Sequence, residues 1–132
     1  MHITPLYASL LALLFVALSV RALRLRKTLR IAIGDSGNAA MLRAMRVHSN
    51  FAEYVPLGLI LISMVELQAA APLLVHGLGI ALLAGRVSHA WGVSQVRENF
   101  SFRIFGMAMT LGTIIVCSGF LLWRWFVAQT GA

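Results

Sequence analysis

Charged residues are scarce in this sequence. Only 11% of its 132 residues are charged, whereas 60% are hydrophobic, and the mean hydropathy is +0.87. Soluble domains are typically about 25% charged and less than half apolar. This composition excludes an ordinary soluble domain and indicates an integral membrane protein.

Cysteine and the short motifs of several enzyme classes are also nearly absent. Cys117 is the single cysteine, so it cannot form an internal disulfide, and we interpret it as a packed apolar side chain. The sequence contains no Cys/His ligand spacing, no GxSxG and no P-loop. It therefore gives no support to zinc, acyl-transfer or nucleotide chemistry, and we predict no metal site.

Acidic residues are outnumbered, with four Asp and Glu against eleven Lys and Arg and a formal net charge of +7. A strongly basic chain raises the possibility of a nucleic-acid partner, because basic patches bind phosphate backbones. Here the basic residues cluster beside apolar runs, where membrane orientation and anionic headgroups require them. We therefore expect membrane lipids, and no nucleic acid, as partners.

Apolar runs define the architecture. Residues 3–20 and 104–123 each match the length that crosses a hydrocarbon core of about 30 Å, and residues 67–85 are nearly as apolar. The remaining run, "YVPLGLILISMV" at 54–65, is too short to span unless its helix reaches back through "RAMRVHSNFAE" at 43–53. The sequence thus predicts a single all-α domain over 1–132, an integral membrane four-helix bundle.

The basic residues predict the orientation of this bundle. Seven of the eleven lie between positions 21 and 46, and Arg97 and Arg103 lie between the third and fourth spans. The positive-inside rule places both links in the cytoplasm, with the termini and the turn at 69–72 on the other side. The alternative that residues 3–20 are a signal peptide is disfavoured because their positive charges follow the run.

Turn and helix-end signals divide the chain further. The segment "GDSGN" at 34–38 predicts a turn, with Asn38 capping a helix that begins at Ala39. An anion site on the backbone of this turn is the less favoured alternative. Pro56 is expected to bend the second span, and Gly106, Gly112 and Gly119 have a spacing that allows close helix approach.

The second span carries a polar stripe. At 100° per residue, Arg43, Arg46, Asn50 and Glu53 share one face, running inward from the cytoplasmic end. His48 lies about 200° from Arg46 and must face another helix or another subunit. The third span offers a facing stripe, formed by Arg86, His89, Val93 and Arg97.

Two interpretations of these stripes remain open. They could be a buried ion network that fixes helix register, with Glu53 and Arg86 as an ion pair. Against that, Glu53 is the only acid facing several cations, so the region holds surplus positive charge. Arg binds carboxylates through two parallel bonds, Glu accepts an ammonium group, and Asn both donates and accepts. The set therefore favours a small zwitterion with more than one carboxylate.

The stretch "RAMRVHSNFAEYVPL" resembles the MAPEG family, the membrane-associated proteins in eicosanoid and glutathione metabolism. Its motif residues here are Arg46, His48, Asn50, Glu53, Tyr54 and Pro56. The basic first link and "GRVSH" in the third span agree, so the likeness covers the whole chain and is nearest to short bacterial members. The resemblance implies a homotrimer in a bacterial inner membrane, with glutathione as co-substrate in a cleft between subunits.

The resemblance also implies roles for individual residues. Glu53 would hold the α-amino group of glutathione and Arg46 a carboxylate, while His48 would face the glutathione of the adjoining subunit. Arg103 is the first choice for stabilising the thiolate, and Arg21 or Arg24 is the second. The remaining residues implied to bind glutathione are Arg21, Arg24, Asn50, Tyr54, Arg86 and His89. Val93 replaces a Tyr that several relatives carry, which alters the thiol end of the site.

Three functions compete on this evidence. The leading interpretation is a glutathione-dependent transferase acting on apolar electrophiles from the bilayer, with reduction of lipid hydroperoxides as an extension. The alternative is a non-catalytic protein that binds a lipid or a partner in the same cleft. A proton-coupled exporter would be expected to carry an acid in its first span, and residues 3–20 have none.

Overall fold

The computed structural model describes residues 2–95 and 99–130, so Arg97 lies outside the described residues. Each of its helices is long and apolar enough to cross a membrane. They span 23 to 31 residues, about 35–47 Å at 1.5 Å per residue. The predicted all-α membrane four-helix bundle is confirmed. The helices are α1 (Thr4–Leu29), α2 (Ala39–Leu67), α3 (Pro72–Ser94) and α4 (Phe100–Thr130).

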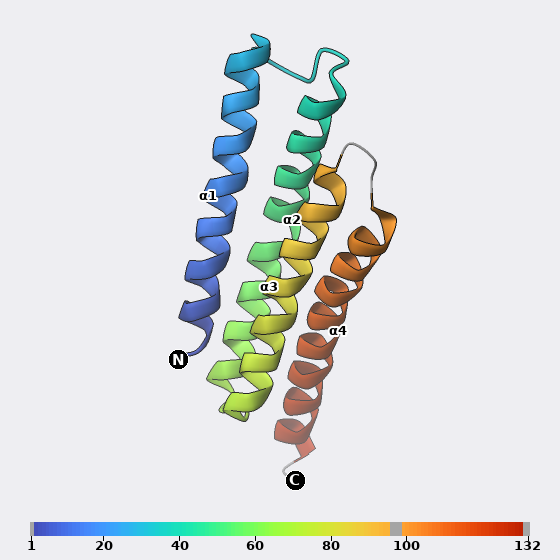
Figure 1. Cartoon of the computed structure of the whole chain (residues 1–132). Coiled ribbons are helices and arrows are strands. Elements are labelled where there is room, and N and C mark those ends of the chain that lie inside the picture. Colours follow the sequence, from blue (N-terminus) through green and yellow to red (C-terminus); the bar gives the residue numbers. More distant parts are fainter. Residues whose placement is uncertain (1, 96–98, 131–132) are drawn as a thin grey trace.

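The basic α1–α2 link lies at the same end of the bundle as the start of α4, which carries Arg103. The α2–α3 turn and both chain ends are at the other end (Figure 1). This arrangement is the one that the positive-inside rule requires. Assignment of the basic end to the cytoplasm stays a prediction.

The helix boundaries near the site follow from local chemistry. Asn38 Oδ1 accepts hydrogen bonds from the backbone N–H groups of Ala40 at 3.0 Å and Met41 at 3.1 Å, so Asn38 caps α2 as predicted. From Ala39 the helix continues through the polar stretch and past Pro56 to Leu67. The second span therefore does reach back through its polar half, which places those side chains on a regular helical face.

Close contact between α3 and α4 fixes the wall opposite α2. A Cβ atom added at Gly106 would lie 2.5 Å from the carbonyl oxygen of Gly85 and 2.6 Å from the backbone nitrogen of His89. The predicted close approach is confirmed at Gly106. At Gly112 and Gly119 a Cβ would meet nothing within 4 Å among the described residues. Cys117 is fully buried in the apolar core, which agrees with its interpretation as a packed apolar side chain.

A carboxylate joins α1 to α2 at the opposite end of the bundle. Glu66 accepts hydrogen bonds from the backbone N–H groups of His2, Ile3 and Thr4 and from the Thr4 hydroxyl, at 2.5–2.9 Å. The N–H donors belong to Thr4, the first residue of α1, and to the two residues before it, and N–H groups at the start of a helix have no partner within the helix. Glu66 therefore caps a helix more than sixty residues away in the chain, a contact that the apolar run ending at Val65 did not predict.

Candidate functional site

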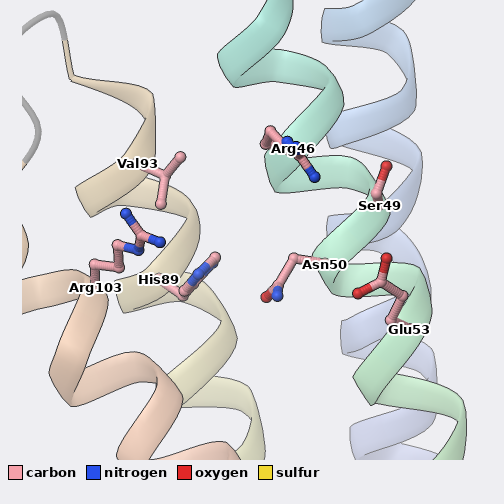
Figure 2. A pocket seen from close by; sticks show the side chains of 7 residues that line it. All are labelled: Arg46, Ser49, Asn50, Glu53, His89, Val93 and Arg103. Atoms are coloured by element: carbon pink, nitrogen blue, oxygen red, sulfur yellow. The ribbon is translucent and has the colours of Figure 1, made fainter.

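A cavity of about 340 Å³ lies between α2 and the α3–α4 pair (Figure 2). α2 forms one wall, and α3 and α4 form the other. Its size falls within the range of small-ligand sites, roughly 300–1,000 Å³. The lining residues are Arg46, Ser49, Asn50, Glu53, His89, Val93 and Arg103.

The α2 wall is the predicted polar stripe. Arg46, Ser49, Asn50 and Glu53 follow one another at i, i+3, i+4 and i+7, so they share one helical face. Arg46, Ser49 and Glu53 are exposed, and Asn50 is half-buried and points toward the other wall (Figure 2). Ser49 was missed by the sequence analysis, although its position one turn from Arg46 and Glu53 is the signal that would have found it.

The opposite wall depends on the glycine contacts between α3 and α4. His89 is buried and faces Asn50 across the cavity, and Arg103 extends beside Val93 (Figure 2). A Cβ at Gly92 would lie 2.9 Å from the backbone nitrogen of Arg103, so α4 begins directly against α3. This contact brings Arg103, the predicted thiolate-stabilising residue, into the same cavity as Arg46 and Glu53.

Arg86 lies beneath the cavity and is only 1% exposed. Its Nη1 donates to Asn50 Oδ1 at 2.8 Å and its Nη2 to Met107 Sδ at 3.5 Å, while its Cζ lies 5.8 Å from the centre of the Tyr54 ring. Its Nε is buried without a hydrogen-bond partner. Arg86 therefore holds Asn50 in place instead of lining the cavity itself.

The predicted ion pair between Glu53 and Arg86 is wrong for this chain. Arg86 bonds to Asn50, and within residues 2–95 and 99–130 no carboxylate lies in ion-pair contact with it. The reason is geometric, because Asn50 lies about 60° from Glu53 around α2, on the side nearer α3. Among the described residues, Glu53 is left as the one carboxylate that lines a cavity with guanidinium groups on both walls, and the buried guanidinium of Arg86 is bonded to Asn50 beside it.

His48 faces away from this cavity, as predicted, and contacts α1. Its Nε2 lies 3.0 Å from Ser19 Oγ, and its ring stacks on Phe15 with centroids 4.7 Å apart. It lines a second cavity of about 330 Å³ between α1 and α2, which also contains Arg26. Ser49 lines both cavities, so the two are adjacent on the exposed side of α2.

Arg21 and Arg24 also lie outside the main cavity. The Arg21 guanidinium donates to Ser94 Oγ at the end of α3, and both arginines line a separate groove on α1. Thus the structure brings Arg46, Asn50, Glu53, His89 and Arg103 together. It places Tyr54 and Arg86 beside them, and it places His48, Arg21 and Arg24 elsewhere in the subunit. Among the described residues no cluster of His, Cys, Asp and Glu could hold a metal ion.

Comparison with known proteins gives two findings. The family model described as MAPEG family matches residues 4–123. Inner membrane protein YecN of Escherichia coli strain K12 is 36% identical over 121 residues, covering 92% of this chain and 91% of the relative, and YecN of Escherichia coli O6:H1 matches equally well. That name states a location and no activity. No solved structure matches.

Proposed function

This chain belongs to the MAPEG family and is an integral inner-membrane protein, and we propose that it is a glutathione-dependent transferase acting on apolar electrophiles. One observation carries the proposal. Among the described residues, the lining of the cavity between α2 and the α3–α4 pair provides guanidinium groups on two walls, one carboxylate and an amide. That set complements a small molecule with two carboxylates and one ammonium group, which is the charge pattern of glutathione.

The positions of these groups suggest how the tripeptide is held. Glu53 and Arg46 lie two turns apart on the same face of α2, so an ammonium group and a carboxylate can bind one wall together. Asn50 is fixed by Arg86 at 2.8 Å and supplies a positioned amide between them. The buried charge of Arg86 also adds to the positive field that attracts an anionic ligand.

Arg103 is the group that we assign to the thiol, because it belongs to the opposite wall from Glu53 (Figure 2). A guanidinium beside the thiol stabilises the thiolate, which is the reactive nucleophile. The thiol proton leaves to solvent, the sulfur forms a bond to the electrophilic carbon, and the leaving group departs with its electron pair. The same thiolate would reduce a lipid hydroperoxide to the alcohol and water, with a second glutathione completing the disulfide.

The site is proposed to be completed in a homotrimer. Arg46, Ser49 and Glu53 are exposed, and Ser49 separates the main cavity from the His48 cavity. A neighbouring subunit packed on this side of α2 would bring its own His48 cavity against the glutathione of the first. This arrangement would give His48 the role expected from the family motif, although His48 faces α1 within its own subunit.

The proposal is tested by conjugation of glutathione to 1-chloro-2,4-dinitrobenzene, followed as absorbance, with the purified protein in detergent. We expect turnover that saturates with glutathione. Arg103→Gln should lower kcat by about 10²-fold, as loss of one electrostatic stabiliser does, and change KM for glutathione much less. Arg124→Gln, a matched loss of charge at the far end of α4, should have no effect. Unchanged turnover in Arg103→Gln would contradict the assignment.

One observation favours the non-catalytic alternative. Val93 is buried beside Arg103 at the thiol end of the cavity and supplies no hydroxyl group there. The thiolate would then depend on guanidinium groups alone. If glutathione stabilises the protein but no electrophile is turned over, the chain is a binding protein that uses the same cavity.

A further inference from the structure

A second basic site lies on the outer side of α1. A groove of about 620 Å³ runs along this helix and shares no lining residue with the proposed glutathione cavity. Most of its lining belongs to α1, and the start of α2 closes one end. The lining residues are Leu13, Val16, Ala17, Val20, Arg21, Arg24, Leu25, Thr28 and Ala40.

The groove changes from apolar to basic along its length. Leu13, Ala17, Val20, Arg24 and Thr28 are spaced by three or four residues, so they form one strip about 22 Å long. Its first half is wholly apolar, with Leu13 68% and Val16 56% exposed. Its second half carries two guanidinium groups and a hydroxyl, and this half lies at the end of the bundle that holds the basic α1–α2 link (Figure 1).

The described residues that line the basic half include no counter-charge, because none of the lining residues of the groove is acidic. Arg21 donates to Ser94 Oγ on α3, so its guanidinium is held at the groove instead of extending freely toward solvent. Arg24 is exposed one turn further along α1. Two guanidinium groups one turn apart present several N–H donors to a single anion, and a phosphate accepts them in pairs.

We propose that this groove binds one anionic phospholipid from the leaflet at the basic end of the bundle. Its phosphate lies on Arg21 and Arg24, and an acyl chain follows Leu13 to Val20 toward the bilayer centre. Charge complementarity selects the occupant, because a zwitterionic headgroup would bring its ammonium group beside the same two arginines. An apolar strip alone would accept any lipid tail, so the preference comes from the basic half.

The experiment titrates phosphatidylglycerol and, separately, phosphatidylcholine into the full-length protein in a neutral detergent, with thermal stability and native mass spectrometry as readouts. Phosphatidylglycerol should raise Tm with saturation and remain bound as one molecule per subunit. Arg24→Gln should increase the half-saturating concentration at least fivefold. Ala17→Trp, which fills the apolar half and keeps both charges, should also weaken binding. Lys27→Gln, an equal charge loss on α1 outside the groove, should change it less than twofold.

Three outcomes would overturn the proposal. Equal effects of Arg24→Gln and Lys27→Gln would mean a diffuse surface attraction, and equal stabilisation by both lipids would mean no headgroup selection. A change of oligomeric mass in Ala17→Trp without a change in lipid binding would mean that a second copy of the chain occupies the groove. A glutathione titration of Arg24→Gln is the cross-check. If Arg24→Gln loses the response to glutathione and keeps the response to lipid, Arg24 belongs to the glutathione site and not to the lipid groove.

Discussion

The two glutamates of α2 show how differently one helix can treat the same side chain. Glu66, at one end, accepts four hydrogen bonds from residues 2–4, at and just before the start of α1. Glu53, in the other half, lines a cavity, and among the described residues no side-chain hydrogen bond or ion pair to it is seen. The chain itself satisfies Glu66. Glu53 is available to a ligand.

This difference distinguishes polar groups that stabilise the fold from polar groups that are available to bind a ligand. A polar group in hydrocarbon costs several kcal/mol unless something satisfies it. At Glu66 the partner is the N-terminus of a helix, and its four hydrogen bonds stabilise the fold. Glu53 instead lines a cavity of about 340 Å³ together with the guanidinium groups of Arg46 and Arg103. We call Glu66 with its donors at residues 2–4 the closed cluster, and the residues that line the cavity around Glu53 the open cluster. Substitutions in the two clusters should affect stability and glutathione binding differently.

The largest effect is expected at the contact that supports the far wall of the open cluster. Gly106→Ala would place a Cβ 2.5 Å from the backbone oxygen of Gly85, which cannot move as a side chain can, so we expect a loss of about 3 kcal/mol. Glutathione binding should fall with it, because the α3–α4 wall carries His89 and Arg103. Thermal unfolding in detergent measures the first effect and ligand titration the second.

Gly112→Ala is the matched control for that change. It adds the same methyl group to the same helix, where nothing lies within 4 Å. It should leave stability unchanged or raise it by up to about 1 kcal/mol, since Ala favours helix more than Gly does. An equal loss in both variants would mean that α4 packs against another surface at Gly112.

Glu66→Gln comes next. It weakens the acceptor of three backbone N–H groups and a hydroxyl at the positive end of α1, and hydrogen bonds to charged groups contribute about 1.5–3 kcal/mol. We expect a loss of this order in stability and an unchanged response to glutathione. Thr4→Val removes only the hydroxyl donor and should cost about 1 kcal/mol. A lost glutathione response in Glu66→Gln would show that the two clusters are coupled.

Arg86→Met tests whether the buried Arg86 contributes to stability or to glutathione binding. Arg86 has no carboxylate partner among the described residues, and replacing buried charges by apolar side chains is often neutral or stabilising. The free energy of unfolding should therefore change by less than about 1 kcal/mol. Asn50 would lose its bond to Nη1, and the affinity for glutathione should fall about tenfold. Isothermal titration calorimetry measures the affinity. A large loss of stability with normal affinity would instead place Arg86 in the architecture.

Glu53→Gln should have the smallest effect on stability. The side chain is exposed, and within residues 2–95 and 99–130 no hydrogen bond or ion pair links it to another helix, so the free energy of unfolding should change by less than about 0.5 kcal/mol. Its effect on glutathione affinity should be at least fivefold, because the amide cannot balance an ammonium charge. Asp35→Asn, in the α1–α2 link, removes a carboxylate outside the cavity and should leave the affinity unchanged.

Much of this arrangement could be predicted from the sequence, because it depends on periodicity. The apolar runs predicted four helices, and the spacing of Arg46, Asn50 and Glu53 predicted one wall of the cavity. The partner of Arg86 could not be predicted in the same way. Glu53 and Asn50 differ by only about 60° around α2, and the packing of α2 on α3 decides between them.

The long-range contacts could not be predicted from the sequence for a similar reason. Glu66 and Thr4 are 62 residues apart, and nothing in either local segment indicates the other. The glycines of α4 have nearly equal spacing, yet only Gly106 meets α3 closely. Which face of a helix meets its neighbour depends on the packing of the whole bundle, so spacing alone could not distinguish Gly106 from Gly112.

The most direct test is a glutathione titration of thermal stability on the wild type, Glu53→Gln and Glu66→Gln in one detergent. A ligand at 100 times its Kd stabilises the native state by about 2.7 kcal/mol. The wild type and Glu66→Gln should show the same saturable rise in Tm, the latter from a lower starting value, while Glu53→Gln should show little. A wild type that does not respond, or a Glu53→Gln variant that responds fully, would contradict the assignment of the open cluster to glutathione.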